Sequence, residues 1–173
     1  MNSLCIIPCG RKKIWDDYPE LKQVPAGNAY TGTLHRKSRA YADMFCSDVR
    51  ILSAKHGFLA LTDKVEENYD LSFHSPRKSI ISLRDLRLQV MKQSLLHYDR
   101  IIVLTGKKYR PFLERIFPGE AVNYPLIHCR GIGYILRELQ SAVDTLSPLP
   151  EHFVKHPEEE SHRNAEELIK NSF

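Results

Sequence analysis

The sequence predicts a three-layer α/β/α sandwich built on a mainly parallel, four-stranded sheet. Short apolar runs that end in turn residues alternate along the chain with longer segments whose apolar residues recur every three to four positions. The first pattern is typical of strands buried on both faces, and the second of amphipathic helices that cover them. With 42% hydrophobic and 27% charged residues in a length of 173, the composition is that of one soluble globular domain.

Each predicted strand is a short aliphatic run followed by a turn signal, as in Leu4-Cys5-Ile6-Ile7-Pro8 before Cys9-Gly10. On this basis the strands are expected at residues 4–8, 49–53, 100–105 and 121–127. The helices are expected at residues 32–45, 82–97, around 112–117 and at 131–146. The stretches 11–27 and 61–76 are polar and irregular, and their length favours functional loops over plain connections.

Charge is unevenly distributed along the chain. Residues 1–147 are expected to form the α/β domain, and residues 148–173 a proline-containing linker with an acidic C-terminal helix. The net charge of the chain is +4. The residues after 150 contain six glutamates and three cations, a net charge of −3, so the preceding residues carry +7. A basic body of this kind suits an anionic partner such as nucleic acid or a nucleotide.

Several classes of protein are not favoured. The longest apolar runs fall far short of the roughly 20 residues of a membrane span, and residues 1–8 lack the basic and apolar regions of a secretory signal. We therefore expect a cytoplasmic protein without membrane contact and with reduced thiols. Cys5 and Cys9 do not have zinc-knuckle spacing, so no metal or cofactor is predicted, and the oligomeric state is left open.

Four segments follow the predicted strands, and each contains a glycine and a cation. In a parallel sheet they meet at the carboxyl edge, where small residues, helix N-termini and cations form an anion site. An alternative is that the glycines only make turns and the cations are solvated. Known phosphate loops are absent, since Gly131-Ile132-Gly133 does not continue as a dinucleotide motif. The predicted phosphate- or substrate-binding residues are Cys9, Gly10, Arg11, Lys12, Tyr30, Gly32, Arg36, Ser53, Lys55, Tyr69, Gly106, Gly131 and Gly133.

The predicted catalytic residues are His56 and Asp70. His56 directly follows a strand, where an imidazole would donate a hydrogen bond to a leaving group, and Asp70 would place a water or stabilise a developing cation. The alternative is a structural hydrogen bond for His56 and a turn cap for Asp70. Cys9 is a third candidate, as a nucleophile whose pKa a neighbouring cation would lower.

These motifs resemble those of an uncharacterised bacterial and phage domain family over nearly all of residues 3–140. The resemblance is carried by Pro8-Cys9-Gly10-Arg11-Lys12-Lys13, Ala29-Tyr30-Thr31-Gly32, Arg36-Lys37-Ser38-Arg39-Ala40-Tyr41, Ser53-Ala54-Lys55-His56-Gly57, Tyr69-Asp70-Leu71 and Gly106-Lys107-Lys108-Tyr109. That family is distantly similar to YaaA-type peroxide-stress proteins and to the uracil-DNA-glycosylase-like domain of archaeosine-forming enzymes. The resemblance implies a glycosylase-like α/β fold and a connection with nucleic acid or nucleobases.

The leading functional hypothesis is therefore N-glycosidase-like cleavage of a nucleobase from nucleic acid or a nucleotide. A duplex target would be flipped out, with Tyr30 or Tyr69 stacking on the extruded base. The alternative is a non-catalytic DNA- or RNA-binding protein of stress response or phage defence, and a third hypothesis is a transferase that uses Cys9.

Overall fold

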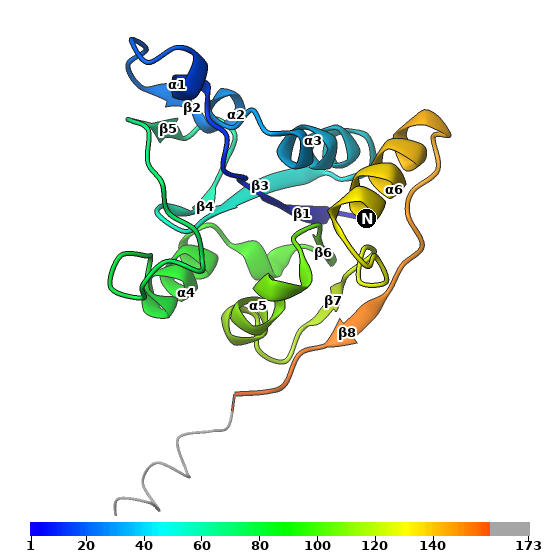
Figure 1. The fold of residues 1–173 in the computed structure, drawn as a ribbon. Helices are drawn as coiled ribbons and strands as arrows, with labels where there is room; N and C mark the ends of the chain where they lie inside the picture. Colours follow the sequence, from blue (N-terminus) through cyan, green and yellow to red (C-terminus); the bar gives the residue numbers. More distant parts are fainter. Residues whose placement is uncertain (160–173) are drawn as a thin grey trace, which may run out of the picture.

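A six-stranded mixed sheet forms the centre of the protein in a computed structural model that describes residues 1–159 (Figure 1). The strand order is β4-β3-β1-β6-β7-β8. Four strands are mutually parallel, namely β1 (Ser3–Pro8), β3 (Asp48–Ser53), β6 (Arg100–Val103) and β7 (Ala121–Asn123). The register pairs Cys5 with Val49 on one side of β1 and with Ile102 on the other.

The predicted four-stranded sheet is wrong, because an antiparallel strand is added at each edge. At one edge, β4 (Gly57–Leu59) forms a hairpin with β3, and at the other, β8 (Phe153–Lys155) pairs with β7. Both strands have three residues, too short to give an alternating pattern. The segment predicted as a linker thus contributes a strand, whereas the predicted acidic C-terminal helix lies mainly in residues 160–173, outside the described part.

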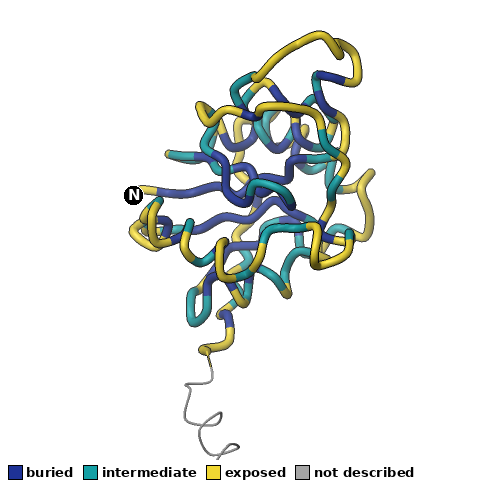
Figure 2. The backbone as a smooth tube through the Cα atoms, turned by 90° about the vertical axis from the view of Figure 1, so that its left-hand side faces the viewer, coloured by how far each residue is buried: buried dark blue, intermediate teal, exposed yellow. Residues whose placement is uncertain are grey.

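Helices cover both faces of the sheet. On one face lie α3 (Thr33–Phe45) and α6 (Ile132–Asp144), and on the other α4 (Leu83–Lys92) and α5 (Arg110–Ile116). Alternate residues of β1 supply the two cores: Cys5 and Ile7 pack beneath α3 and α6, and Leu4 and Ile6 beneath α4 and α5. Figure 2 shows the buried strands enclosed by half-buried and exposed segments.

The helix predicted at 82–97 is interrupted. Its first part, α4, begins after the cap Ser82, whose hydroxyl accepts the Asp85 N–H at 3.0 Å. Ser94 then adopts φ +54°, and a 3-10 turn, η1 (Leu95–His97), leads into β6. A second 3-10 turn, η2 (Lys107–Tyr109), precedes α5.

The long polar loops contain short elements of their own. The first holds α1 (Ile14–Asp17), β2 (Val24–Pro25) and α2 (Ala26–Ala29), and β2 pairs with β5 (Lys64–Val65) from the second loop. The two loops therefore meet beside the carboxyl ends of β1 and β3. Among residues 1–159, no helix combines the length and apolarity required to cross a bilayer.

The outer edge of β4 is covered by side chains of α4 and of Gln93, the residue that caps its C-terminus. Gln89 accepts the Phe58 N–H at 2.7 Å and donates to the His56 carbonyl at 2.8 Å, while Gln93 donates to the Phe58 carbonyl at 3.0 Å. These amides satisfy backbone groups that would otherwise pair with another chain. Gly57 has φ +72°, and a Cβ there would lie 2.1 Å from Gln89 Oε1, so the turn requires glycine.

Candidate functional site

A polar side chain lies at the carboxyl end of each parallel strand. Cys9 follows β1, Ser53 ends β3, Thr105 lies just beyond β6 and Tyr124 follows β7, and all four are buried. The chain continues from β1 to α3 on one face of the sheet and from β6 to α5 on the other face. It therefore diverges between these two neighbouring strands. Such a divergence opens the crevice in which open α/β sheets bind ligands.

Three hydroxyls form a chain across this edge. Ser53 Oγ accepts the backbone N–H groups of Lys55 at 3.2 Å and His56 at 3.1 Å, and Tyr69 Oη lies 2.7 Å away from it. Because both acceptor positions of Ser53 are used, its own hydrogen is donated to Tyr69. Tyr69 Oη also lies 2.5 Å from Tyr30 Oη, and either hydroxyl can be the donor. The hydroxyl chain thus runs from Ser53 through Tyr69 to Tyr30.

Burial keeps both tyrosines neutral. It raises the pKa of Tyr30 to about 12, against the smaller effect of the hydrogen bond with Tyr69. It raises the pKa of Tyr69 further still. Both phenols are therefore donors at physiological pH.

Lys13 is buried at the centre of the same group of residues, with only 2% of its surface exposed. Its Nζ donates to the Arg11 carbonyl at 2.9 Å and lies 4.3 Å from the centroid of the Tyr69 ring. No carboxylate in the described part of the chain forms an ion pair with it, and burial lowers its pKa. The sequence does not predict Lys13 as a site residue, because no sequence signal distinguishes it from the exposed Lys12. In the fold, a backbone bridge to Tyr30 turns Lys13 inward.

Cys9 lies beside this ammonium group. Burial raises the pKa of its thiol, and the opposing effects of Lys13 and of the Gly10 and Ala54 N–H groups are smaller. The thiol is therefore protonated near pH 7, which does not favour the cysteine-nucleophile hypothesis.

A smaller hollow of about 370 Å³ opens beside Tyr69, lined by Arg11, Asp16, Asn68, Tyr69 and Asp70. The Asp16 carboxylate accepts the Lys13 N–H at 2.9 Å and the Asn68 side-chain N–H at 3.1 Å, and these hydrogen bonds lower its pKa. Asp70 is exposed at this hollow, which Arg11 also lines.

The two predicted catalytic residues do not contact each other. The His56 ring packs edge-on against Tyr69, with centroids 5.2 Å apart, and its buried Nε2 has no hydrogen-bond partner in the described residues. Burial lowers the pKa of His56, so the ring is neutral near pH 7. No hydrogen bond joins it to Asp70 within residues 1–159, and it lines neither the smaller hollow nor the larger one described next.

A larger hollow of about 1010 Å³ lies at the ends of β6 and β7. Its apolar interior includes Leu34, Val103, Leu126 and Ile135, and two aromatic rings, Tyr109 and Tyr124, join the lining. Its polar lining consists of Thr105, Gly106, Lys107, Lys108, Arg110, Glu114, Arg130 and Gly131.

Positive charge dominates the larger hollow. Glu114 is its one acidic lining residue, and it forms an ion pair with Arg110 at 2.8 Å. Lys107, Lys108 and Arg130 are exposed and form no ion pair within residues 1–159. The N-terminus of α6 also faces this hollow through Gly131 and Ile132. Thr105 is 6% exposed, and its Oγ1 has no hydrogen-bond partner in the described part.

Cys9 lines neither hollow but lies near one tyrosine of each. Burial raises the pKa values of Tyr69, in the smaller hollow, and Tyr109, in the larger one, and a thiolate at Cys9 would raise both further. Cys9 is thus close to Tyr69 and to Tyr109.

Ten of the fifteen residues predicted for the site lie around Tyr69 or line one of the two hollows. Cys9, Tyr30, Ser53, Lys55 and His56 surround Tyr69, with Lys55 Nζ 5.3 Å from its ring centroid. Arg11 and Asp70 line the smaller hollow, and Gly106 and Gly131 the larger one.

The other predicted residues lie outside the two hollows. Lys12 pairs with Asp17 at 3.4 Å on the surface, and Arg36 is exposed on α3. Gly10 has φ +76° at its turn, Gly32 caps α3, and Gly133 lines neither hollow.

Comparison with known proteins identifies the family. A family of unknown function, DUF6884, matches residues 4–141. The chain belongs to this family. It is also 40% identical over 145 residues to the uncharacterized protein YfjM of Bacillus subtilis (strain 168), covering 83% of this chain and 97% of that protein. No solved structure matches. The relationship to YaaA-type and uracil-DNA-glycosylase-like proteins stays a prediction.

Proposed function

We propose that the carboxyl edge of the sheet binds a nucleotide, either free or within a nucleic acid, and that the protein cleaves its N-glycosidic bond. The observation that carries the binding proposal is the larger hollow, which is lined by Thr105, with its buried, unpartnered hydroxyl, and by three cations that form no ion pair within residues 1–159. The hollow is as large as typical small-molecule sites, which reach about 1000 Å³.

The lining matches the two chemical parts of a nucleotide. Lys107, Lys108 and Arg130, with the α6 N-terminus, supply the cations and N–H groups that bind phosphate. The rings of Tyr109 and Tyr124 and the aliphatic interior suit a planar base, and Thr105 offers it a hydrogen bond.

In the proposed reaction, water adds to the anomeric carbon while the base departs with a proton. In this scheme Asp70, which is exposed in the smaller hollow, stabilises the cationic sugar or places the water. His56, the predicted donor to the departing base, is neutral and packs against Tyr69, which lines the smaller hollow. The uracil-DNA-glycosylase-like relationship is proposed on the sequence motifs and on the parallel strands covered on both faces.

Release of free base from DNA, RNA or nucleotides, measured by chromatography, tests the reaction. Release should fall by about a hundredfold or more in Asp70→Asn, by analogy with the loss of other acid–base groups. Asp43→Asn, which removes an exposed carboxylate on α3, is the matched control. No release from any substrate, or equal release by both variants, would remove the N-glycosidase assignment.

A second candidate function is nucleotide or nucleic-acid binding without catalysis. It is favoured because the larger hollow has one carboxylate in its lining, Glu114, and this carboxylate is already paired with Arg110 instead of being free for catalysis. This candidate predicts binding that weakens with salt and yields no product.

A further inference from the structure

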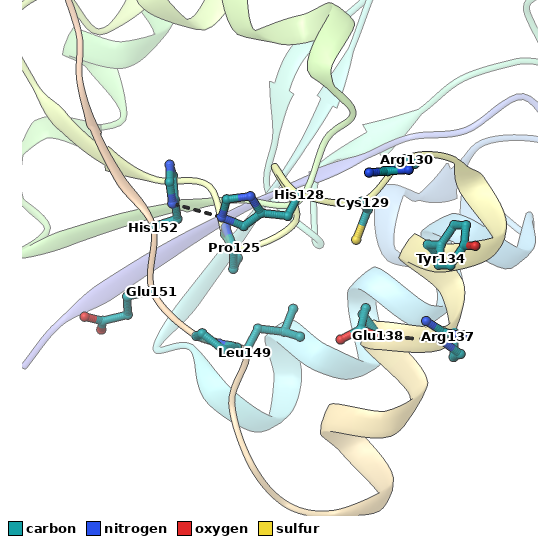
Figure 3. Close-up of a pocket in the computed structure, with 11 residues that line it drawn as sticks. Pro125, His128, Cys129, Arg130, Tyr134, Arg137, Glu138, Leu149, Glu151 and His152 are labelled. Atoms are coloured by element: carbon teal, nitrogen blue, oxygen red, sulfur yellow. Dashed lines mark hydrogen bonds and ion pairs between the residues drawn. The ribbon is translucent and has the colours of Figure 1, made fainter.

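A third hollow of about 450 Å³, here called the flanking hollow, adjoins the larger one (Figure 3). Both hollows are lined by Cys129 and Arg130, so the loop that carries these residues forms their common wall. A ligand that extends past Arg130 would leave the larger hollow and enter the flanking one.

Aromatic rings form the sides of the flanking hollow. Tyr134, on the first turn of α6, is 51% exposed, and the Arg137 guanidinium lies 4.9 Å from its ring centroid. On the opposite side, the His128 and His152 rings meet edge to face with centroids 4.7 Å apart, and His128 Nε2 lies 3.2 Å from His152 Nδ1. Figure 3 shows the two histidines across the hollow from Tyr134.

The backbone around these rings is held in place. The His152 N–H donates to the Asn123 side chain at 2.7 Å, and the Leu149 N–H donates to the Tyr41 hydroxyl at 3.1 Å. Leu149 and Pro125 supply apolar surface at the base of the hollow. The flanking hollow is therefore formed before any ligand arrives.

Apart from Arg130 on the common wall, its charges are balanced, unlike those of the larger hollow. Glu138 lies 3.7 Å from Arg137, and Glu151 pairs with Arg100 and points out of the hollow in Figure 3. Stacking surfaces without excess positive charge suit a base more than a phosphate. Arg130, on the common wall, is placed for the phosphate between two nucleotides.

We propose that the ligand is a single-stranded nucleic acid, with one nucleotide in the larger hollow and the base of its neighbour in the flanking hollow. This inference rests on the proposed nucleotide-binding function and specifies the class of ligand. Stacking of one base on an aromatic side chain contributes a factor of about 5 to 150 in affinity. A short oligonucleotide should therefore bind more tightly than a mononucleotide by about that factor.

The test compares the affinities of thymidine monophosphate, a thymidine tetranucleotide and a hairpin duplex, measured by calorimetry at one salt concentration. Tyr134→Ala should weaken tetranucleotide binding at least about fivefold and leave mononucleotide binding unchanged. Tyr18→Ala, which removes another exposed tyrosine, is the control. Far-UV circular dichroism checks that both variants are folded.

The outcomes separate the two proposals. If the mononucleotide binds but the tetranucleotide binds no more tightly, or if Tyr134→Ala weakens both equally, the flanking-hollow inference is wrong and nucleotide binding stands. Tighter binding of the duplex than of the tetranucleotide also overturns it. If no nucleotide of any kind binds, the proposed function fails, and this inference fails with it.

Discussion

Replacing Tyr69 by Phe should destabilise the protein more than replacing Tyr30 by Phe. Tyr69 occupies the middle of the hydroxyl chain, so Tyr69→Phe removes two hydrogen bonds and leaves the buried hydroxyls of Ser53 and Tyr30 without that partner. A lost neutral hydrogen bond costs about 1 kcal/mol, and a buried group left unsatisfied up to about 3 kcal/mol. We expect a loss of about 2–3 kcal/mol in the free energy of unfolding. The phenyl ring keeps its packing against His56 and Lys13.

Tyr30→Phe removes only the terminal hydrogen bond, so its expected cost is about 1 kcal/mol. Urea unfolding followed by circular dichroism measures both losses, provided that the m-values stay equal. Tyr18→Phe, at a residue 55% exposed, should change nothing. The reasoning would be refuted if Tyr69→Phe cost no more than Tyr30→Phe, since Tyr69 would then not link the other two hydroxyls.

Three further predictions concern the fold around the site. Gln89→Ala should lower the free energy of unfolding in urea by about 2–3 kcal/mol, because it leaves the Phe58 N–H and the His56 carbonyl without partners. It should also increase self-association in light scattering, since the edge of β4 is then exposed. Unchanged stability and association would contradict the role of Gln89 at this edge. Burial lowers the pKa of His156, so the unfolded chain takes up a proton near pH 6.5 that the folded chain does not. Stability should therefore fall between pH 7 and 5, with a shallower slope in His156→Gln; equal slopes would count against it. Burial likewise lowers the pKa of Lys13, so stability relative to Lys13→Met should rise as the pH approaches 10, whereas a pH-independent difference would refute this.

The sequence predicts the central parallel strands because each is a continuous apolar run, a local property. The edge strand β4 was missed because its edge is completed by Gln89 and Gln93, some thirty residues further along the chain. No short-range pattern carries that information. The break at Ser94 was likewise hidden, because the apolar spacing continues through it into η1.

The candidate site was predicted in its parts but not in its connections. Tyr30, Ser53 and Tyr69 were each recognised in separate motifs, yet their hydrogen-bonded chain depends on the pairing of two long loops through β2 and β5. Lys13 was not predicted as a site residue, because a cation in a basic run is normally solvated. No hydrogen bond joins His56 to Asp70 within residues 1–159, which spacing alone could not show.

The most direct test of the central claim is a calorimetric titration of the protein with a nucleoside monophosphate, the matching nucleoside and inorganic phosphate. The monophosphate should bind more tightly than either fragment, and Lys107→Ala combined with Arg130→Ala should weaken its binding about tenfold or more. Arg84→Ala with Lys92→Ala, on α4, removes the same charge away from the hollow and should leave binding unchanged. Absence of nucleotide binding, or equal loss in both double variants, would contradict the assignment of the larger hollow as a nucleotide site.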